Sequence, residues 1–319
     1  MKKVLLQVRD LCVEYWNAGQ DVPVVDQVSF DIREGEIFGL AGESGSGKST
    51  IGKSIMRILP PPGVISGGQV LFKGQDILQM SDNDLRALRW SQIAMVFQSA
   101  LESLNPVLSI GEQIIDTLEA HGFNGDRTQH AQELMELVGI DPARISSYPH
   151  QLSGGMRQRV GIALALALTP DLLIMDEPTT ALDVVVQREI LQRIYQLRSK
   201  FEFSILFITH DLPLMLSFAD RIGILYAGRV CEIAPAKTLL KSARHPYAQS
   251  LMSAFPDIEG KRTPQGISGN PPSLRNPPSG CRFHPRCEDQ FEACSLSHPK
   301  LVQLREDHEV ACHLTENDS

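Results

Sequence analysis

The sequence lacks any apolar run long enough to cross a lipid bilayer. Its best candidate, Ile162–Leu168, falls far short of the roughly 20 residues that a membrane-spanning helix needs. The opening residues Met1–Val4 lead into an alternating, strand-like pattern without an apolar region or a small-residue cleavage site, so we expect no secretion signal. Any role at a membrane is therefore expected to depend on partner subunits.

An excess of positive charge is also absent. The chain has 30 Lys and Arg residues against 38 Asp and Glu residues, which gives a formal net charge of -8 and a pI near 5.6. A general nucleic-acid-binding surface carries a basic electrostatic footprint. We therefore expect no nucleic acid among the partners.

Cysteine is scarce, and its distribution is uneven. Of the six cysteines, two lie in strand patterns and are expected in the core, namely Cys12 and Cys231. The other four crowd into the C-terminal segment, at Cys281, Cys287, Cys294 and Cys312. In a chain without a secretion signal, such a group favours metal or cluster ligation over disulfides.

The length of 319 residues and a hydrophobic content of 42% are enough for a sizeable core and suggest about two domains. A β-rich opening is followed by short apolar strands that alternate with helices, which predicts a parallel, three-layer α/β sheet. We expect this domain over residues 1–256, with a helical insertion at about 101–165. A Pro/Gly-rich linker over 257–280 and a small Cys-rich region over 281–319 would follow.

One glycine-rich stretch matches the phosphate-loop pattern G-x-x-x-x-G-K-[ST]. An apolar strand-like segment, Ile37–Ala41, precedes it, and a helical pattern, Ile51–Ile58, follows it. The stretch consists of Gly42, Glu43, Ser44, Gly45, Ser46, Gly47, Lys48, Ser49 and Thr50. A chance glycine-rich turn would not carry both flanks, so the sequence predicts a site for a nucleoside triphosphate.

The chemistry of phosphate binding explains these residue types. The glycines allow the backbone to curl so that its N–H groups point at phosphate oxygens. The helix N-terminus adds roughly half a positive charge where the anion lies. Lys48 is expected to reach the β- and γ-phosphates, and the Ser49 hydroxyl is expected to ligate Mg²⁺.

Polar residues follow three of the predicted strands. Asp176, after the apolar run Leu172–Met175, is placed to hold Mg²⁺ through water, and the adjacent Glu177 to polarise the water that attacks the γ-phosphate. His210 ends the next strand and is expected to hydrogen-bond the γ-phosphate. Gln98 ends its own strand, where it would touch Mg²⁺ or the attacking water.

A second helix start has the character of a phosphate site. The segment Leu152–Arg159 contains a Ser-Gly-Gly turn at the beginning of a helical pattern, and Ser153 alone would be an ordinary N-cap. The first loop already surrounds its own phosphates, so this helix start would need another nucleotide. A second subunit facing the first head-to-tail would supply that nucleotide.

Together these residues resemble an ATP-binding subunit of an ABC transporter, over about residues 4–256. Gly42–Thr50 match the Walker A motif and Gln98 matches the Q-loop glutamine. Asp176 and Glu177 match Walker B and the catalytic glutamate. The resemblance further assigns Ser153, Gly154, Gly155 and Gln158 to the signature motif, Asp183 to the D-loop and His210 to the switch histidine. Tyr15 lies where the family stacks an aromatic ring on adenine, although it fits equally a core tyrosine at a strand end.

The C-terminal segment is similar to that of oligopeptide and dipeptide importer ATPases. The resemblance is carried by Asn270-Pro271-Pro272, by Cys281–Cys287, by Cys294 and by Val310–His313. Members with such a segment carry a [4Fe–4S] cluster on four cysteines, which the resemblance implies here. The C-x₂₋₄-C knuckles of many zinc sites are missing. Zinc and free thiols stay open as alternatives.

The resemblance implies a function: the chain would bind and hydrolyse ATP to energise uptake of peptides across the cytoplasmic membrane. The same subfamily also imports oligosaccharides and nickel. Implied partners are a second ATPase subunit, commonly a different one, two transmembrane permease subunits and an extracytoplasmic binding protein. The chain would lie peripherally on the cytoplasmic face of the inner membrane.

Two other classes fit less well. A soluble ABC-type ATPase acting on DNA would need a long coiled coil between Lys48 and Asp176, and one acting on ribosomes would have two ATPase units. A small-molecule P-loop kinase would not need the Ser-Gly-Gly turn at Ser153.

Overall fold

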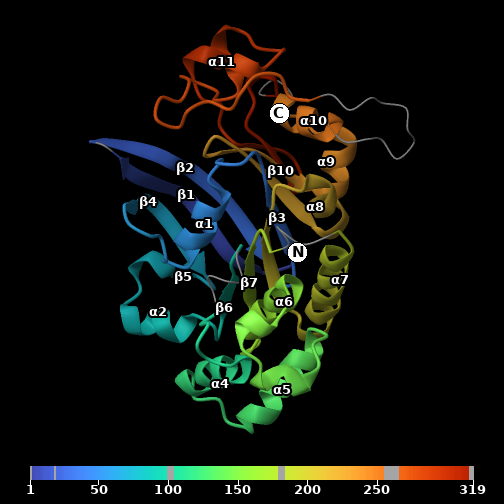
Figure 1. Cartoon of the computed structure of the whole chain (residues 1–319). Helices are drawn as coiled ribbons and strands as arrows, with labels where there is room; N and C mark the ends of the chain where they lie inside the picture. Colours follow the sequence, from blue (N-terminus) through green and yellow to red (C-terminus); the bar gives the residue numbers. More distant parts are fainter. Residues whose placement is uncertain (1, 18, 99–103, 179–183, 255–265, 316–319) are drawn as a thin grey trace. The chain divides into compact units, whose positions relative to one another are not determined.

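The computed structural model describes residues 2–17, 19–98, 104–178, 184–254 and 266–315 (Figure 1). The chain folds into two compact units. The smaller unit is built from Gln79–Leu206, and the larger one from Lys3–Leu78 and Phe207–Ser319. Across the described residues, no helix combines the length and the apolar character needed to cross a membrane.

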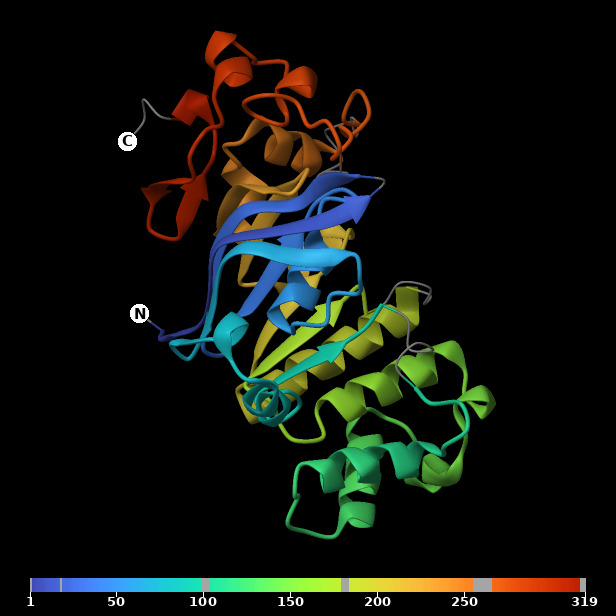
Figure 2. The same cartoon turned by 90° about the vertical axis from the view of Figure 1, so that its left-hand side faces the viewer.

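The larger unit contains an antiparallel sheet near its N-terminus, with strand order β2-β1-β4-β5 (Figure 2). Its strands are β1 (Val4–Asn17), β2 (Gln20–Arg33), β4 (Gly63–Phe72) and β5 (Gln75–Asp76). Alternate side chains of β1, among them Leu6 and Val8, are fully buried. This period-2 burial is what the alternating sequence predicts for a sheet with one face in the core.

The larger unit also contributes the strand run β11-β12-β10-β9-β3 to a second sheet. The β3–β9 pair is parallel, and the other pairs in this run are antiparallel. The strands are β3 (Ile37–Ala41), β9 (Arg221–Tyr226), β10 (Arg229–Pro235), β11 (Val302–Arg305) and β12 (His308–Val310). Phe30 of β2 stacks on Phe38 of β3 with ring centroids 5.1 Å apart, so the two sheets share one core.

Short helices connect these strands. They are α1 (Lys48–Ile55), α8 (Leu212–Phe218), α9 (Ala236–Ser242), α10 (Pro246–Ser253), α11 (Glu292–Leu296) and the 3₁₀ turns η4 (His284–Arg286) and η5 (His313–Thr315). The turn η1 (Ile77–Gln79) and the strand β8 (Ser204–Ile208) span the boundaries between the two units.

The smaller unit combines two buried parallel strands with a group of helices. Strands β6 (Ile93–Val96) and β7 (Leu172–Asp176) pair in parallel and are buried along their whole length. The helices are α2 (Asp82–Leu88), α4 (Ile110–Ala120), α5 (Arg127–Leu137), η2 (Pro142–Ser146), η3 (Pro149–Gln151), α6 (Gly154–Ala165) and α7 (Val184–Phe201). Ser109 and Glu112 form a capping box that fixes the start of α4. The described part of the region 101–165 contains the helices α4, α5 and α6.

The Cys-rich segment adds two strands to the sheet of the larger unit. Strand β12 pairs antiparallel with β10, with Glu232 opposite Val310 and Ile233 opposite Glu309. The pairing is fixed by a buried contact in which His308 Nε2 lies 2.8 Å from Glu232 Oε1. Nearby, Phe283 is 2% exposed and packs against Tyr226 and Tyr247. Burying a phenylalanine contributes about 1.5–3 kcal/mol to folding.

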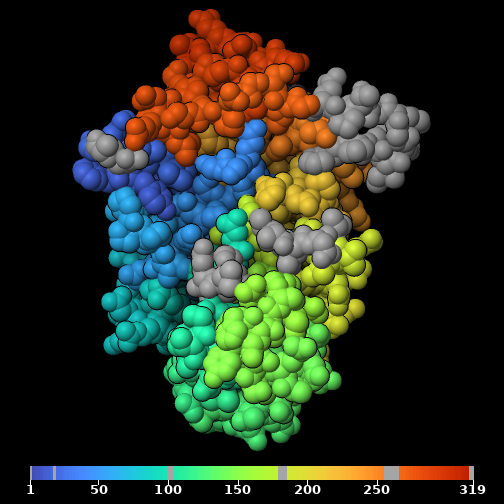
Figure 3. Space-filling model, in the orientation of Figure 1, coloured from blue at the N-terminus to red at the C-terminus, as the bar shows by residue number. Residues whose placement is uncertain are grey.

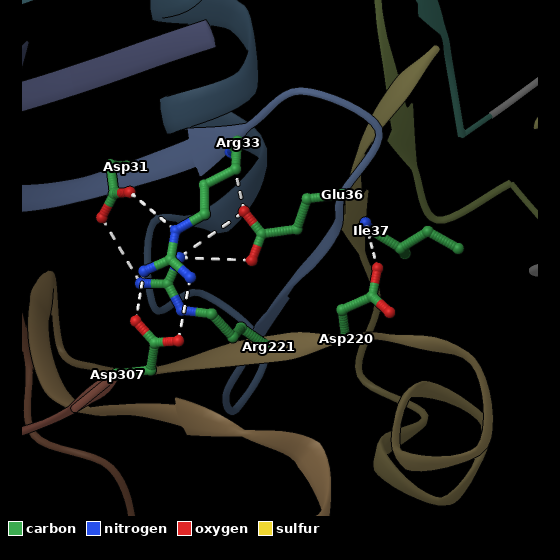
Figure 4. Close-up of polar contacts among 7 residues, drawn as sticks. All are labelled: Asp31, Arg33, Glu36, Ile37, Asp220, Arg221 and Asp307. Carbon is green, nitrogen blue, oxygen red and sulfur yellow. Dashed lines mark hydrogen bonds and ion pairs between the residues drawn. The ribbon is translucent and has the colours of Figure 1, made fainter. Parts of the chain in front are cut away.

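A cluster of ion pairs fastens the turn between β11 and β12 to the end of β2 (Figure 4). Arg33 makes a bidentate ion pair with Asp307. Beside it, the buried Arg221 donates to Glu36 Oε1 at 3.2 Å and to Asp31 Oδ1 at 3.4 Å. Burial raises the pKa of Glu36, and the charge of Arg221 opposes that rise. Removing one member of the buried Arg221–Glu36 pair would leave an uncompensated charge. The partly exposed Arg33–Asp307 pair connects the C-terminal segment to this cluster.

Candidate nucleotide-binding site

The glycine-rich loop lies between β3 and α1, as the sequence predicts. Gly42 has φ 152°, and a Cβ atom there would come within 2.1 Å of the Leu225 carbonyl oxygen. Gly47 has φ 100°, and its Cβ would lie 2.7 Å from the Val24 carbonyl oxygen. Only glycine fits both positions. Because the chain turns at Gly47, helix α1 begins at Lys48, three residues before the predicted start.

The ammonium group of Lys48 lies inside the curl of this loop. Lys48 is 5% exposed, and its Nζ donates to the carbonyl oxygens of Gly42 at 2.8 Å and Glu43 at 2.9 Å. Ser44 and Gly45, at the tip of the loop, are exposed. The loop therefore presents a fixed cation and a helix N-terminus at an accessible surface, which is an arrangement for binding a polyphosphate.

The ends of β6 and β7 bring two predicted catalytic residues together. Asp176 is 2% exposed at the end of β7, and Glu177 follows it with φ 44°. Gln98, which follows β6, donates from Nε2 to Glu177 Oε2 at 3.1 Å. A non-glycine residue at positive φ is strained, and such strain clusters at functional sites. The structure thus supports placing Gln98 and Glu177 in one constellation.

The signature segment forms the start of α6. Ser153 is the N-cap, and its Oγ accepts a hydrogen bond from the Met156 N–H at 3.3 Å. Ser153 and Gly154 are exposed, and among the described residues no atom beyond the adjoining helix backbone lies within 4 Å of a Cβ built on Gly154. The first N–H groups of an α-helix have no partner inside the helix. The exposed start of α6 is therefore accessible to a phosphate group, which could accept hydrogen bonds from N–H groups of the first turn.

Other predicted site residues are placed as follows. His210 is exposed, two residues after the end of β8, and Asp211 next to it caps α8. Tyr15 is half-buried on β1 and lies against Gly63 of β4, whose Cβ would come 2.9 Å from the tyrosine ring. Asp183 lies outside the described residues. The adenine contact of Tyr15 stays a prediction.

The predicted Mg²⁺ ligands are divided between the two units. Ser49 belongs to the larger unit, with the phosphate loop and His210, whereas Gln98 and Asp176 belong to the smaller unit. A joint magnesium site on these residues stays a prediction.

Sequence reasoning missed two residues that hold the phosphate loop. Tyr247 Oη accepts a hydrogen bond from the Glu43 N–H at 3.1 Å, and Arg286 donates to both oxygens of the Glu43 carboxylate at 2.9 and 3.1 Å. Both residues come from the C-terminal part of the chain, more than 200 positions away in sequence. No local sequence pattern predicts either contact.

The four C-terminal thiols line one narrow cavity. Its wall includes Cys281, Cys287, Cys294 and Cys312 together with His245, and its interior admits about one water molecule. Burial raises the pKa of Cys281 and Cys287, and it raises that of Cys312 to about 11. Four thiols are a suitable donor set for a soft metal. Within the described ranges, however, no three His, Cys, Asp or Glu side chains are arranged to hold a metal ion.

Comparisons with known proteins agree with this geometry. The family "ABC transporter" matches residues 25–180, and the family "Oligopeptide/dipeptide transporter, C-terminal region" matches residues 231–294. The dipeptide transport ATP-binding protein DppD of Caldanaerobacter subterraneus subsp. tengcongensis is 42% identical and aligns over 98% of both chains. The oligopeptide transport ATP-binding protein OppD of Bacillus subtilis is 39% identical, over 99% of this chain and 90% of the relative.

Among solved structures, the chain resembles the dimeric ATP-binding cassette MJ0796, in a post-hydrolysis state with ADP and Pi. The TM-score is 0.66 at 28% identity, and the match covers 73% of this chain and 99% of the other. The fold and the site define a P-loop ATPase of the ABC type, which uses ATP and Mg²⁺. The chain belongs to the family of ABC transporter ATP-binding proteins that carry the oligopeptide/dipeptide transporter C-terminal region.

Proposed function

We propose that this chain is one of two ATP-hydrolysing subunits in an importer of dipeptides and oligopeptides. The supporting observation is that the similarity to the DppD and OppD proteins extends over nearly the whole chain, including the C-terminal region. An ATPase subunit does not itself contact the cargo, so the proposal about peptides rests on these relatives.

The proposed mechanism uses a nucleotide shared between two facing subunits. The phosphate loop of one subunit binds ATP through its backbone N–H groups and Lys48, and the Ser153–Gly155 segment of the other contacts the γ-phosphate. Ser49 and Asp176 hold Mg²⁺, and Glu177 is the general base for the attacking water. The accessible start of α6 supports this arrangement, since Ser153 and Gly154 are exposed.

The importer would contain further partners. These are a second ATPase subunit of a different sequence, two transmembrane permease subunits and an extracytoplasmic substrate-binding protein. ATP-driven closing of the two ATPases and their release after hydrolysis would move the permeases. In this arrangement the chain is peripheral at the cytoplasmic face of the inner membrane.

Uptake measurements in cells that lack this chain test the choice of cargo. We expect deletion of this chain to abolish uptake of labelled dipeptides and oligopeptides. Uptake of nickel and of oligosaccharides should stay within about twofold of the wild-type rate, since transporters discriminate cargo by differential binding. The wild-type chain should restore peptide uptake, whereas a chain with Lys48→Ala should not. Loss of nickel or oligosaccharide uptake with peptide uptake intact would refute the peptide assignment.

We also propose that Cys281, Cys287, Cys294 and Cys312 bind a [4Fe–4S] cluster, with zinc as the alternative. The convergence of all four thiols on one cavity supports this proposal. The full chain, purified without oxygen, should contain roughly four iron and four sulfide per molecule and absorb visible light. Cys281→Ser should abolish this absorption, and Cys12→Ser should preserve it. Colourless protein with stoichiometric zinc would exclude the cluster.

A further inference from the structure

The second residue of the phosphate loop, Glu43, is held by residues outside the loop. Its N–H donates to Tyr247 Oη at 3.1 Å, and its carboxylate accepts two hydrogen bonds from Arg286. Its carbonyl oxygen accepts from Lys48 Nζ at 2.9 Å. Glu43 therefore connects the C-terminal segment to the lysine that is expected to meet the phosphates.

Arg286 is itself fixed by its surroundings. Its Nε donates to the Ser268 carbonyl oxygen at 2.8 Å, and its Nη1 also donates to Tyr226 Oη at 3.1 Å. The guanidinium lies over the rings of Tyr226 and Phe283, with its central carbon 5.7 and 5.9 Å from the two ring centroids. Its side chain is only 6% exposed. A planar guanidinium held in this way loses little further conformational entropy when it donates two parallel hydrogen bonds to a carboxylate.

This contact has an electrostatic consequence for nucleotide binding. A triphosphate in the loop carries several negative charges, and a carboxylate in the same loop would repel them. Coulomb repulsion is stronger near a protein surface than in bulk water because the effective dielectric constant is lower. A guanidinium that pairs with the carboxylate removes most of this repulsion, and it also limits how far the loop can move.

We propose that Arg286 is a positioning residue of the nucleotide site, which neutralises Glu43 and holds the phosphate loop in the shape that binds ATP. Arg286 belongs to the turn η4 and directly precedes Cys287. The Cys-rich segment is therefore part of the support of the ATP site. The proposal rests on ATP binding alone, so its failure would leave the proposed cargo and the shared-nucleotide mechanism untouched.

A double-mutant cycle on the full chain tests the proposal. The quantity to measure is the equilibrium Kd for a fluorescent ATP analogue, in the wild type, Arg286→Met, Glu43→Gln and the double variant. Arg286→Met should raise Kd about tenfold in the wild-type background, which corresponds to ~1.4 kcal/mol. In the Glu43→Gln background the same substitution should change Kd by less than about twofold, since the carboxylate that it would expose is gone.

A merely structural role of Arg286 predicts a different pattern. If Arg286→Met weakens ATP binding equally in both backgrounds, or not at all in the wild type, the proposal is wrong. In the assembled complex, Arg286→Met should raise the KM for ATP. The kcat should stay within about twofold of the wild-type value, because Arg286 does not touch the reacting water. Arg286→Lys keeps the charge but not the paired hydrogen bonds, so its Kd for the ATP analogue should lie between those of the wild type and Arg286→Met. This variant replaces Arg286→Met in the test if the methionine variant does not fold.

The chain offers a matched control in the same segment. Arg305 lies on β11 and is exposed. Arg305→Met removes a guanidinium from the C-terminal segment without touching the loop, and Kd should stay within about twofold of the wild type, as for most exposed substitutions. A tenfold loss with this control would show that any charge lost from the segment weakens ATP binding, which would overturn the specific role of Arg286.

Discussion

Replacing Glu177 with glutamine should reduce ATP turnover by about 10³-fold while ATP binding is retained, because a positioned general base contributes roughly 10²–10⁴ in rate. Glutamine has nearly the same shape as glutamate and keeps an oxygen that can accept the hydrogen bond from Gln98 Nε2. In the proposed mechanism, what it loses is the ability to accept a proton from the attacking water. Single-turnover hydrolysis and equilibrium binding of ATP, measured on the same preparation, separate the two effects.

Glu136→Gln provides the matched control for this substitution. Glu136 is exposed on α5, in the same unit as Glu177, and its change should leave turnover within about twofold of the wild type. Turnover by Glu177→Gln within tenfold of the wild type would mean that another group activates the water.

The phosphate loop was predictable in detail because its constraints are local. The nine positions contain three glycines, a lysine and a hydroxyl in the motif spacing, and they lie between an apolar strand and a helical pattern. Few loop structures other than a phosphate loop are compatible with this combination. The positive φ angles of Gly42 and Gly47 follow from the same local requirement. Within the loop itself, the start of α1 differs from the prediction: the helix begins at Lys48 because the turn at Gly47 leads straight into it.

The strand ends were predictable for a related reason. Short, wholly apolar runs bounded by polar residues indicate buried parallel strands. The parallel pairing of β6 with β7 agrees with the expected parallel sheet, whereas the contact between Gln98 and Glu177 was not predicted. The strain at Glu177 could not be foreseen, since glutamate has no particular preference for a positive φ.

The C-terminal segment could not be placed from its sequence. Strands β11 and β12 are short, and the strand β12 that pairs with β10 is separated from it by a long, Pro- and Gly-rich stretch of sequence. Their docking depends on pairs such as Arg33 with Asp307, 274 positions apart (Figure 4). Contacts at such separations depend on the finished fold. For the same reason the contact between Arg286 and Glu43 could not be predicted from the sequence. In Figure 3 the orange and red C-terminal residues lie next to blue N-terminal residues.

The second large effect is expected at the start of α6. Substituting Ser153→Arg and Gly155→Asp together places a bulky cation and a carboxylate where the proposed mechanism brings the γ-phosphate of the facing subunit. Removing one preorganised donor from a reacting oxyanion typically costs 10²–10³ in rate. Turnover should fall by at least about 100-fold, and each chain should still bind ATP through its own phosphate loop.

An ordinary N-cap makes a different prediction for the same serine. Ser153 and Ser109 both cap helices of the smaller unit, and each accepts a hydrogen bond from the third residue of its helix. Ser109→Ala and Ser153→Ala should each cost about 1 kcal/mol of stability. Only Ser153→Ala should also slow ATP hydrolysis, since Ser109 has no proposed nucleotide partner.

The most direct test is the rate of ATP hydrolysis by the purified complex in which every copy of this chain carries Ser153→Arg and Gly155→Asp and the partner ATPase carries the equivalent changes. If ATP is shared between the phosphate loop of one subunit and the α6 start of the other, hydrolysis should fall to the level of the Lys48→Ala complex. Hydrolysis at the wild-type rate would contradict the shared site and leave each chain to act alone.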